Sequence, residues 1–325
     1  MTRPATEHNS VLVSEILMKH WHLRERPLRT NLGVSRATWR VGQEYWLSQS
    51  EEGRAPQLIR QAQVLRRLDC FLKDRGWSIS VPEIVPSFSG ELILNDRGYG
   101  WSLTRHLEGF HPESSNPGVY SALVDGLAQF HRALRLFSEH QPGGVAQGIG
   151  SKTRQYIERL HREAFVPFTT DEREGEVLAC ASEWLLPRLV RFERLPGQLI
   201  HGDWTPQNVL FGFQDARLIA VLDFEEIRMD PVHVDVANIC STLLMWSGLN
   251  RPEQRMREVL TDYERFSSSC LELEDVHTAM LAHWFCHYWN WRDRIESGGF
   301  GKDVMERLCL RLTSVLKYLN ATPVP

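Results

Sequence analysis

The sequence lacks the closely spaced cysteines of disulfide-rich domains and zinc sites. Its six cysteines are scattered and form no CxxC pair; they are Cys70, Cys180, Cys240, Cys270, Cys286 and Cys309. Because both classes of site need cysteines grouped at short spacings, this pattern argues against either one. It predicts reduced thiols.

A strong excess of either charge is also missing. The chain has 37 lysines and arginines against 41 aspartates and glutamates, which gives a formal net charge of −4. Proteins that bind nucleic acid present a basic excess on one face or over a whole domain. We therefore expect no nucleic-acid partner.

Long hydrophobic runs are absent as well. No run of 18 apolar residues occurs in the sequence, and a membrane-spanning helix needs about that length. The stretch MTRPATEHNSVLVSEILMKHW at 1–21 has neither the uninterrupted apolar segment nor the cleavage site of a signal peptide. We expect a cytoplasmic protein with no membrane partner.

Residues 1–108 have the pattern of a small α+β unit, in a chain whose 325 residues suffice for two domains. We expect helices at 11–21 and 56–75, and strands at 38–41, at 45–48 and on either side of a turn at 95–98. The second helix would end at Gly76 and bury a face made of Leu58, Ala62, Leu65, Leu68 and Leu72.

Residues 109–325 change to long helical patterns. We expect helices at 119–137, 153–161 and 171–191, the last capped by Asp171, and further helices to about Leu319. The glycine-rich segment 140–152 is expected to be a loop. His131, within the first of these helices, is typical of a packed side chain rather than a catalytic one.

The stretch LIHGDWTPQNVLFG at 199–212 places polar groups between two strand-like segments, and ARLIAVLDF at 216–224 predicts a third strand paired with the second. Asp203 and Asn208 would then lie on a loop at one end of a small sheet, with Asp223 at the end of the neighbouring strand. Carboxylate and amide oxygens suit Mg²⁺ that shares its coordination with phosphates. A further carboxylate can accept a proton from a hydroxyl, so the set favours phosphoryl transfer.

The motif HGDWTPQN followed by VLDFEE resembles the signature of the aminoglycoside phosphotransferase and choline kinase superfamily, small-molecule relatives of protein kinases. The resemblance spans roughly residues 28–310 and is strong at 199–240. It implies an α+β, bilobal, protein-kinase-like fold. A small N-terminal nucleotide-binding lobe with an antiparallel sheet would occupy 1–108, with a hinge at about 101–109. A larger, mainly helical C-terminal lobe at 109–325 would carry catalysis and acceptor binding.

The same resemblance assigns roles to residues of the motif. It implies that Asp203 is the catalytic base, that His201 organises the loop, and that Asn208 and Asp223 bind Mg²⁺. ATP or GTP would be the co-substrate. The later segment DPVHVDVAN implies that Asp235 braces the catalytic loop through hydrogen bonds.

The nucleotide lobe departs from the family pattern at two positions. The lysine that reaches the nucleotide phosphates falls on Ser48, and its glutamate partner falls on Gln61. Either the alignment is shifted, or an arginine replaces the lysine, or nucleotide binding is weakened or lost. The candidate arginines are Arg36, Arg40 and Arg60, and main-chain N–H groups at Ser35 to Thr38 could add phosphate contacts.

The stretch LAHWFCHYWNWRDRIE at 281–296 predicts a helix with one polar and one aromatic stripe. The polar stripe contains His283, His287, Asn290 and Arg294, and the aromatic stripe contains Trp284, Tyr288, Trp291 and Ile295. The histidine pair has no third ligand in the sequence pattern and does not by itself predict a metal site. As acceptor-binding candidates we take Trp204, His287 and Trp291.

The expected function is transfer of the γ-phosphate of a nucleoside triphosphate to a hydroxyl of a small molecule. An amino alcohol, a sugar or an aminoglycoside-like antibiotic would each fit, and the sequence does not choose among them or fix the oligomeric state. The alternative is a non-catalytic nucleotide-binding pseudokinase or scaffold that has lost the lysine and glutamate pair. A protein kinase is less favoured, because DFEEIRMDP leads directly into a helical segment without an activation segment.

Overall fold

The computed structural model describes residues 8–30, 37–50, 55–113, 118–140, 148–162, 167, 173–214, 217–246, 251–267, 269–296 and 302–321. The chain divides into two compact units. The first unit contains residues 1–110 and 209–225, and the second unit contains residues 111–208 and 226–325. We predicted a single boundary between residues 108 and 109. The two units do not follow it, because residues 209–225 group with residues 1–110. The functional lobe boundary stays a prediction.

The first unit is built on an antiparallel sheet with the order β1-β2-β3-β6-β4, and β5 pairs with β6 beside this path. Its strands are β1 (Pro27–Thr30), β2 (Ala37–Val41), β3 (Tyr45–Ser50), β4 (Ile84–Val85), β5 (Leu94–Asp96) and β6 (Tyr99–Arg105). The sequence predicted β2, β3, β5 and β6, whose tight turns contain glycines with positive φ, Gly42 at 57° and Gly98 at 81°. It missed the edge strand β1 and the two-residue β4, which are short and pair without a local turn signal.

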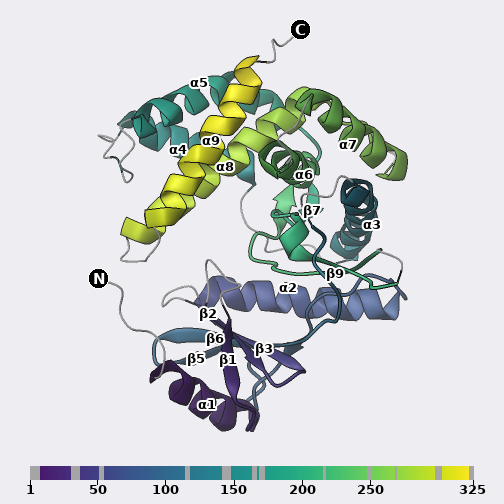
Figure 1. Ribbon diagram of the computed structural model, residues 1–325, viewed down its shortest axis with the longest axis vertical. Coiled ribbons are helices and arrows are strands. Elements are labelled where there is room, and N and C mark those ends of the chain that lie inside the picture. The colour runs from purple at the N-terminus through teal and green to yellow at the C-terminus, as the bar shows by residue number, and fades with distance from the viewer. Residues whose placement is uncertain are drawn as a thin grey trace. The chain divides into compact units, whose positions relative to one another are not determined.

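Two helices flank this sheet on opposite faces (Figure 1). Helix α1 (His8–Trp21) buries Leu17 against a core that includes Trp39 and Trp101 of the sheet. Helix α2 (Ala55–Asp74) buries the five apolar residues predicted for its inner face, each at most 8% exposed. Gly76 follows with φ 64°, which confirms the predicted helix end.

The predicted strand pair after the central loop is present, but the strand predicted before the loop is not part of the same sheet. Strands β8 (Val209–Phe211) and β9 (Leu218–Val221) form a hairpin within the first unit. Strand β7 (Gln198–Ile200), in the second unit, pairs instead with β10 (Arg228–Asp230). The expectation of one small sheet is therefore wrong: the segments before and after the central loop belong to different two-stranded sheets.

The rest of the second unit is helical (Figure 1). Its helices are α3 (Gly118–His140), α4 (Ile149–Arg162), α5 (Glu174–Phe192), α6 (His233–Trp246), α7 (Pro252–Ser267), α8 (Leu273–Glu296) and α9 (Lys302–Ala321), with the short 3-10 turn η1 at Pro206–Asn208. Helix α4 starts at Ile149, so the expected loop at 140–152 is wrong over its last residues. Arg173 occupies the N-cap position of α5, and the predicted cap Asp171 lies outside the described residues.

The α+β class, an antiparallel sheet followed by a mainly helical remainder, is confirmed. Within the described part of the chain, no helix combines the length and apolarity needed to cross a lipid bilayer.

The core between α1 and the sheet gives a direct test of the first unit. We expect Leu17→Ala to lower the free energy of unfolding by about 2–5 kcal/mol, because Leu17 is 0% exposed and its loss leaves a cavity. The neighbouring Met18, 38% exposed, is the matched control, and Met18→Ala should cost well under half as much. Urea denaturation measures both, and equal losses would contradict this packing.

Candidate active site

The second residue of the central loop at 201–208 is Gly202, which no other residue can replace without strain. Gly202 has φ 86°, a conformation that L side chains rarely adopt. A Cβ atom there would lie 2.2 Å from the carbonyl oxygen of Glu226 and 2.5 Å from Nη1 of Arg228. The loop therefore packs directly against the segment that leads into β10.

The loop is fixed by a single carboxylate from α6. Asp235 is 0% exposed, and its Oδ2 accepts the N–H of His201 at 2.9 Å while Oδ1 accepts the N–H of Gly202 at 2.7 Å. On the other side of Gly202, the Asn238 side chain donates to the Gly202 carbonyl at 3.2 Å. The bracing role inferred for Asp235 therefore matches the hydrogen bonds found.

His131 supports Asp235 from α3. Its Nε2 donates to Asp235 Oδ2 at 2.9 Å, because an ionised carboxylate can only accept. Its Nδ1 lies 2.7 Å from the hydroxyl of Tyr263. The predicted packed histidine is buried, 3% exposed, and it also belongs to the hydrogen-bond chain that holds the loop.

The pKa of Asp235 reflects these contacts. Burial alone would raise the pKa of its carboxyl, but the hydrogen bond from His131, the charges of His131 and His201, and the Gly202 N–H together hold the pKa below its ordinary value. Asp235 is therefore ionised at neutral pH. A buried carboxylate of this kind stabilises the loop only while its donors stay in place.

Asp203 and Asn208 meet on this braced loop. The Asn208 amide nitrogen donates to the main-chain oxygen of Asp203 at 2.9 Å and to its carboxylate at 2.8 Å. Asp203 is half-buried, and its N–H donates to Nδ1 of the fully buried His201 at 3.3 Å. Since the Asn208 nitrogen is occupied, its amide oxygen remains as the atom that can bind a cation.

Asp223 follows β9 in the first unit, where it is exposed and has φ 55°. Its Oδ1 accepts the N–H of Glu225 at 3.4 Å, a contact that turns the segment sharply after the strand. Because Asn208 belongs to the second unit, joint metal binding by Asp223 and Asn208 stays a prediction. In the described residues, no cluster of three or more His, Cys, Asp or Glu side chains could hold a metal alone.

Gln61 of α2 is connected to the segment that carries Asp223. Its amide nitrogen donates to the main-chain oxygen of Glu225. Ser48 lies on β3 opposite Ser102 of β6 and is partly buried. At the positions predicted for the family's lysine and glutamate, the chain thus has a small hydroxyl and an amide that binds main chain.

The residues predicted to contact the nucleotide phosphates lie in different surroundings. Arg40 donates through Nε to the Gly42 carbonyl at 3.1 Å and through Nη2 to the Gln43 carbonyl, and its guanidinium lies 5.0 Å from the ring centroid of Trp46. Arg40 therefore binds the β2–β3 turn, which does not fit a phosphate contact. Ser35 and Arg36 lie outside the described residues, and Arg60 is exposed on α2.

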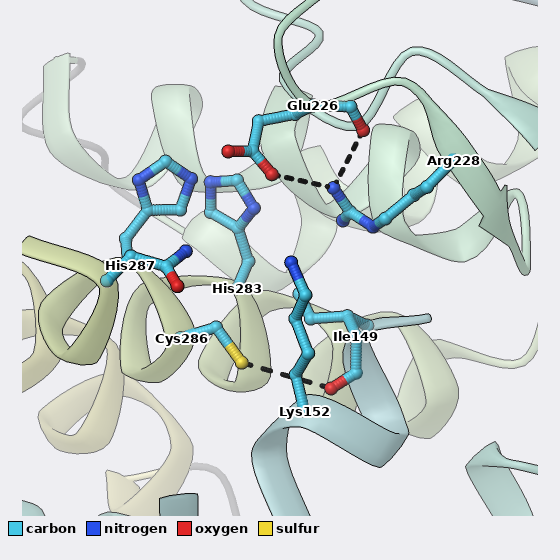
Figure 2. Close-up of a pocket in the computed structure, with 8 residues that line it drawn as sticks. Ile149, Lys152, Glu226, Arg228, His283, Cys286 and His287 are labelled. Atoms are coloured by element: carbon cyan, nitrogen blue, oxygen red, sulfur yellow. Dashed lines mark hydrogen bonds and ion pairs between the residues drawn. The ribbon is translucent and has the colours of Figure 1, made fainter. Parts of the chain in front are cut away.

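A small pocket opens within the second unit beside the central loop (Figure 2). Its enclosed volume is about 10 Å³, room for about one water-sized group, within about 220 Å³ of empty space that includes the open solvent at its mouth. Its lining comes from α4, α8 and the segment before and within β10: Ile149, Lys152, Glu226, Arg228, His283, Cys286, His287 and Asn290. The polar stripe predicted on α8 thus contributes three of its members, His283, His287 and Asn290, to one pocket.

The acceptor candidates lie in three different surroundings. His287 lines the pocket, and its ring centroid lies 4.3 Å from that of His283. Trp204 is 0% exposed and stacks on Phe130, so it belongs to the core and has no surface for a ligand. Trp291 is partly buried beneath the Arg294 guanidinium and does not line the described pocket.

The pocket is also lined by residues that no sequence pattern had indicated. Lys152 stood at the edge of an expected loop, and Glu226 and Arg228 stood in an unassigned segment. Their positions depend on the pairing of β10 with β7 and on the start of α4 at Ile149. The alternation of charges in EEIRMD was the only local signal, and it does not specify a pocket.

Comparisons with known proteins show which family and which proteins the chain is similar to. The model of the phosphotransferase enzyme family matches residues 28–267. Acyl-CoA dehydrogenase family member 11 from Pongo abelii and from Homo sapiens are each 32% identical to this chain over 113 residues. That match covers 33% of this chain and 13% of either relative, so the chain corresponds to a small part of those proteins.

Solved structures share the fold across nearly the whole chain at low sequence identity. The GDP and kanamycin complex of APH(2")-IIia has a TM-score of 0.68 at 15% identity and covers 95% of this chain and 99% of its own. Amicoumacin kinase hAmiN with AMP-PNP, Ca²⁺ and Ami has a TM-score of 0.67 at 13% identity; the match covers 98% of this chain and 96% of the kinase chain. Choline kinase LicA from Streptococcus pneumoniae has a TM-score of 0.62 at 16% identity; the match covers 96% of this chain and 100% of the LicA chain.

The tight packing at Gly202 predicts a large effect of a single methyl group. We expect Gly202→Ala to lower the free energy of unfolding by at least about 2 kcal/mol, because backbone strain adds to the clash with the Glu226 carbonyl. Gly90, at φ 83° with open space around it, is the matched control. Gly90→Ala carries only the strain, about 1–2 kcal/mol. Thermal unfolding measures both, and a smaller loss at Gly202 would overturn the packing argument.

The buried carboxylate of Asp235 predicts a specific acid response. Its folded pKa lies below the unfolded value of 3.8, so its stabilising contribution is full at neutral pH and is lost as the pH falls from about 4 towards the folded pKa. We expect Asp235→Asn to cost about 3 kcal/mol or more at pH 7 and to remove this part of the acid slope. Unfolding curves from pH 7 to 3 measure it, with the exposed Asp303→Asn as control. An unchanged slope would contradict the assignment.

Proposed function

The chain belongs to the phosphotransferase enzyme family, and on that basis we propose that it transfers the γ-phosphate of a nucleoside triphosphate to a hydroxyl group of a small molecule. The observation that carries this proposal is the loop at 201–208, held by the buried Asp235, which presents Asp203 beside Asn208. The fold shared with the aminoglycoside and choline kinases supports it.

In the proposed reaction, Asp203 accepts the proton of the acceptor hydroxyl. The hydroxyl oxygen then forms a bond to the γ-phosphorus while the bond from that phosphorus to the bridging oxygen breaks, and the nucleoside diphosphate leaves. The hydrogen bond from Asn208 to the Asp203 carboxylate fixes its orientation, so that one oxygen is directed by the amide and the other is left for the acceptor. The N–H of Asp203 bound to His201 keeps the main chain in this geometry.

The residues present suit a divalent cation of the Mg²⁺ type. The amide oxygen of Asn208 and the carboxylate of Asp223 are hard oxygen ligands, and too few protein groups gather in the described residues for an all-protein cage. We propose that these two residues hold Mg²⁺ together with the nucleotide phosphates. When bound, the ion would neutralise charge on the phosphates.

The co-substrate is proposed to be ATP or GTP. Amicoumacin kinase hAmiN was solved with AMP-PNP and APH(2")-IIia with GDP, so structures of this fold have been solved with both kinds of nucleotide. In this chain, we propose that the hydrogen bond from Gln61 to the Glu225 carbonyl takes over the connection between α2 and the Asp223 segment. With Ser48 and Gln61 both neutral, neither position leaves the other as an unpaired charge.

Asp203→Asn tests the proposed function. We expect a fall in kcat of about 10²–10⁴-fold for phosphate transfer, because the amide cannot accept the proton, with nucleotide affinity retained. The purified protein is assayed against a panel of hydroxyl compounds, and Asp303→Asn on α9 serves as the exposed control.

Full activity in Asp203→Asn would remove the base from the mechanism. If wild type and Asp203→Asn bound nucleotide equally and neither transferred phosphate to any compound, the non-catalytic scaffold would replace the enzyme as the better account.

A further inference from the structure

Three side chains that line the pocket in the second unit, Lys152, Arg228 and Asn290, each have a donor group without an acceptor among the described residues. Lys152 forms no ion pair with any described carboxylate, and Figure 2 shows its ammonium group pointing into the pocket between His283 and Arg228. In the described part of the chain, Nη2 of Arg228 likewise has no hydrogen-bond acceptor. The pocket thus presents the ammonium group of Lys152 and one N–H group of Arg228, whose charge is paired with Glu226 and Asp230.

Asn290 adds a third donor. Its amide oxygen accepts the hydroxyl of Tyr156 at 2.8 Å, which leaves the amide nitrogen without a partner among the described residues. His287 also lines the pocket, and its ring centroid lies 4.3 Å from that of His283 and 5.9 Å from that of Trp284. The pKa of His283 lies well below its ordinary value, because the ring is buried and lies next to His287, so His283 brings no charge at neutral pH.

The acceptor groups of the pocket are already occupied. Glu226, its only lining carboxylate, accepts Nη1 of Arg228 at 3.2 Å, and Asp230 behind it accepts Nε of Arg228 at 2.7 Å and the N–H of Ile149 at 2.8 Å. These bonds fix the Arg228 guanidinium, which is 3% exposed. A cation in the pocket would face Lys152 and would have to compete with Arg228 for Glu226.

The pocket adjoins the loop that carries Asp203. Arg228 and Glu226, which form one wall, lie against Gly202, the residue before Asp203. Both the pocket and this loop belong to the second unit. A group held in the pocket therefore lies next to the loop that carries Asp203, the proposed base.

From these observations we propose that the pocket binds an anionic oxygen group of the acceptor, a carboxylate or a phosphate monoester, through Lys152, Arg228 and Asn290. The acceptor is then a hydroxy acid or a phosphorylated polyol rather than a cationic amino alcohol or aminoglycoside. Oxygen anions suit such a site because each oxygen accepts several hydrogen bonds, and bonds between charged partners are the stronger ones. This inference rests on the proposed function for the transfer step but not for binding.

Binding is tested first, without nucleotide. Acetate, inorganic phosphate and tetramethylammonium are titrated into the whole protein at constant ionic strength, and the side-chain amide signal of Asn290 and the imidazole signals of His287 are followed by NMR. We expect saturable shifts with acetate or phosphate and none with the cation. The anion that saturates at the lower concentration identifies carboxylate or phosphate as the preferred group.

Two variants and one control connect this binding to the pocket. Lys152→Met and the near-isosteric Asn290→Asp should each raise the Kd for the preferred anion about 10-fold or more. Lys317→Met, an exposed lysine on α9 that does not line the pocket, should leave the Kd unchanged. Saturation by the cation, no saturation by either anion, or equal Kd values in Lys152→Met and wild type would each overturn the inference.

Transfer is tested with pairs of acceptors that differ in charge, glycerate against glyceramide and glycerol 3-phosphate against glycerol. We expect the charged member of the preferred pair to have the higher kcat/KM, and Lys152→Met to raise its KM without a matching loss of kcat. Anion binding without any transfer would count against the proposed function and leave the site standing. Phosphate transfer with no preference for the charged acceptor would support the proposed function and contradict the anion site.

Discussion

The hydrogen bonds that Asp235 accepts are the constraint on which the rest of the site depends. A carboxylate with 0% exposure is costly unless donors surround it, and here the donors are His131 and the main-chain N–H groups of His201 and Gly202. The same bonds that keep the charge buried also fix the start of the loop. The direction of Asp203 is therefore set by the core of the second unit and not by the loop alone.

The loop, in turn, connects this core with the pocket. Gly202 lies in a conformation that brings the main chain against Glu226 and Arg228, and those two side chains form one wall of the pocket. Helices α4 and α8 contribute the opposite side through Lys152 and Asn290. The loop that carries Asp203 and the pocket thus belong to one packed arrangement, so a change that moves Gly202 would affect both.

The sequence predicted those parts whose signals are local. The apolar face of α2, the β2–β3 and β5–β6 turns and the close pair Asp203 and Asn208 can all be recognised within a few residues. The short strands β1 and β4 were missed because they pair without a local turn signal. The pairing of β7 with β10 was missed because the two strands are not adjacent in the sequence. The pocket was only half predicted for the same reason: α8 shows its polar stripe in the sequence, whereas Lys152 and Arg228 reach it through tertiary packing.

The central claim is that this chain moves a phosphate group onto a small hydroxyl compound. The most direct measurement is ³¹P NMR of purified protein with ATP or GTP, Mg²⁺ and a panel of neutral and anionic hydroxyl compounds. The account predicts a new phosphate monoester signal that grows in step with the nucleoside diphosphate. Release of inorganic phosphate alone, or no loss of either nucleotide with any compound, would contradict it.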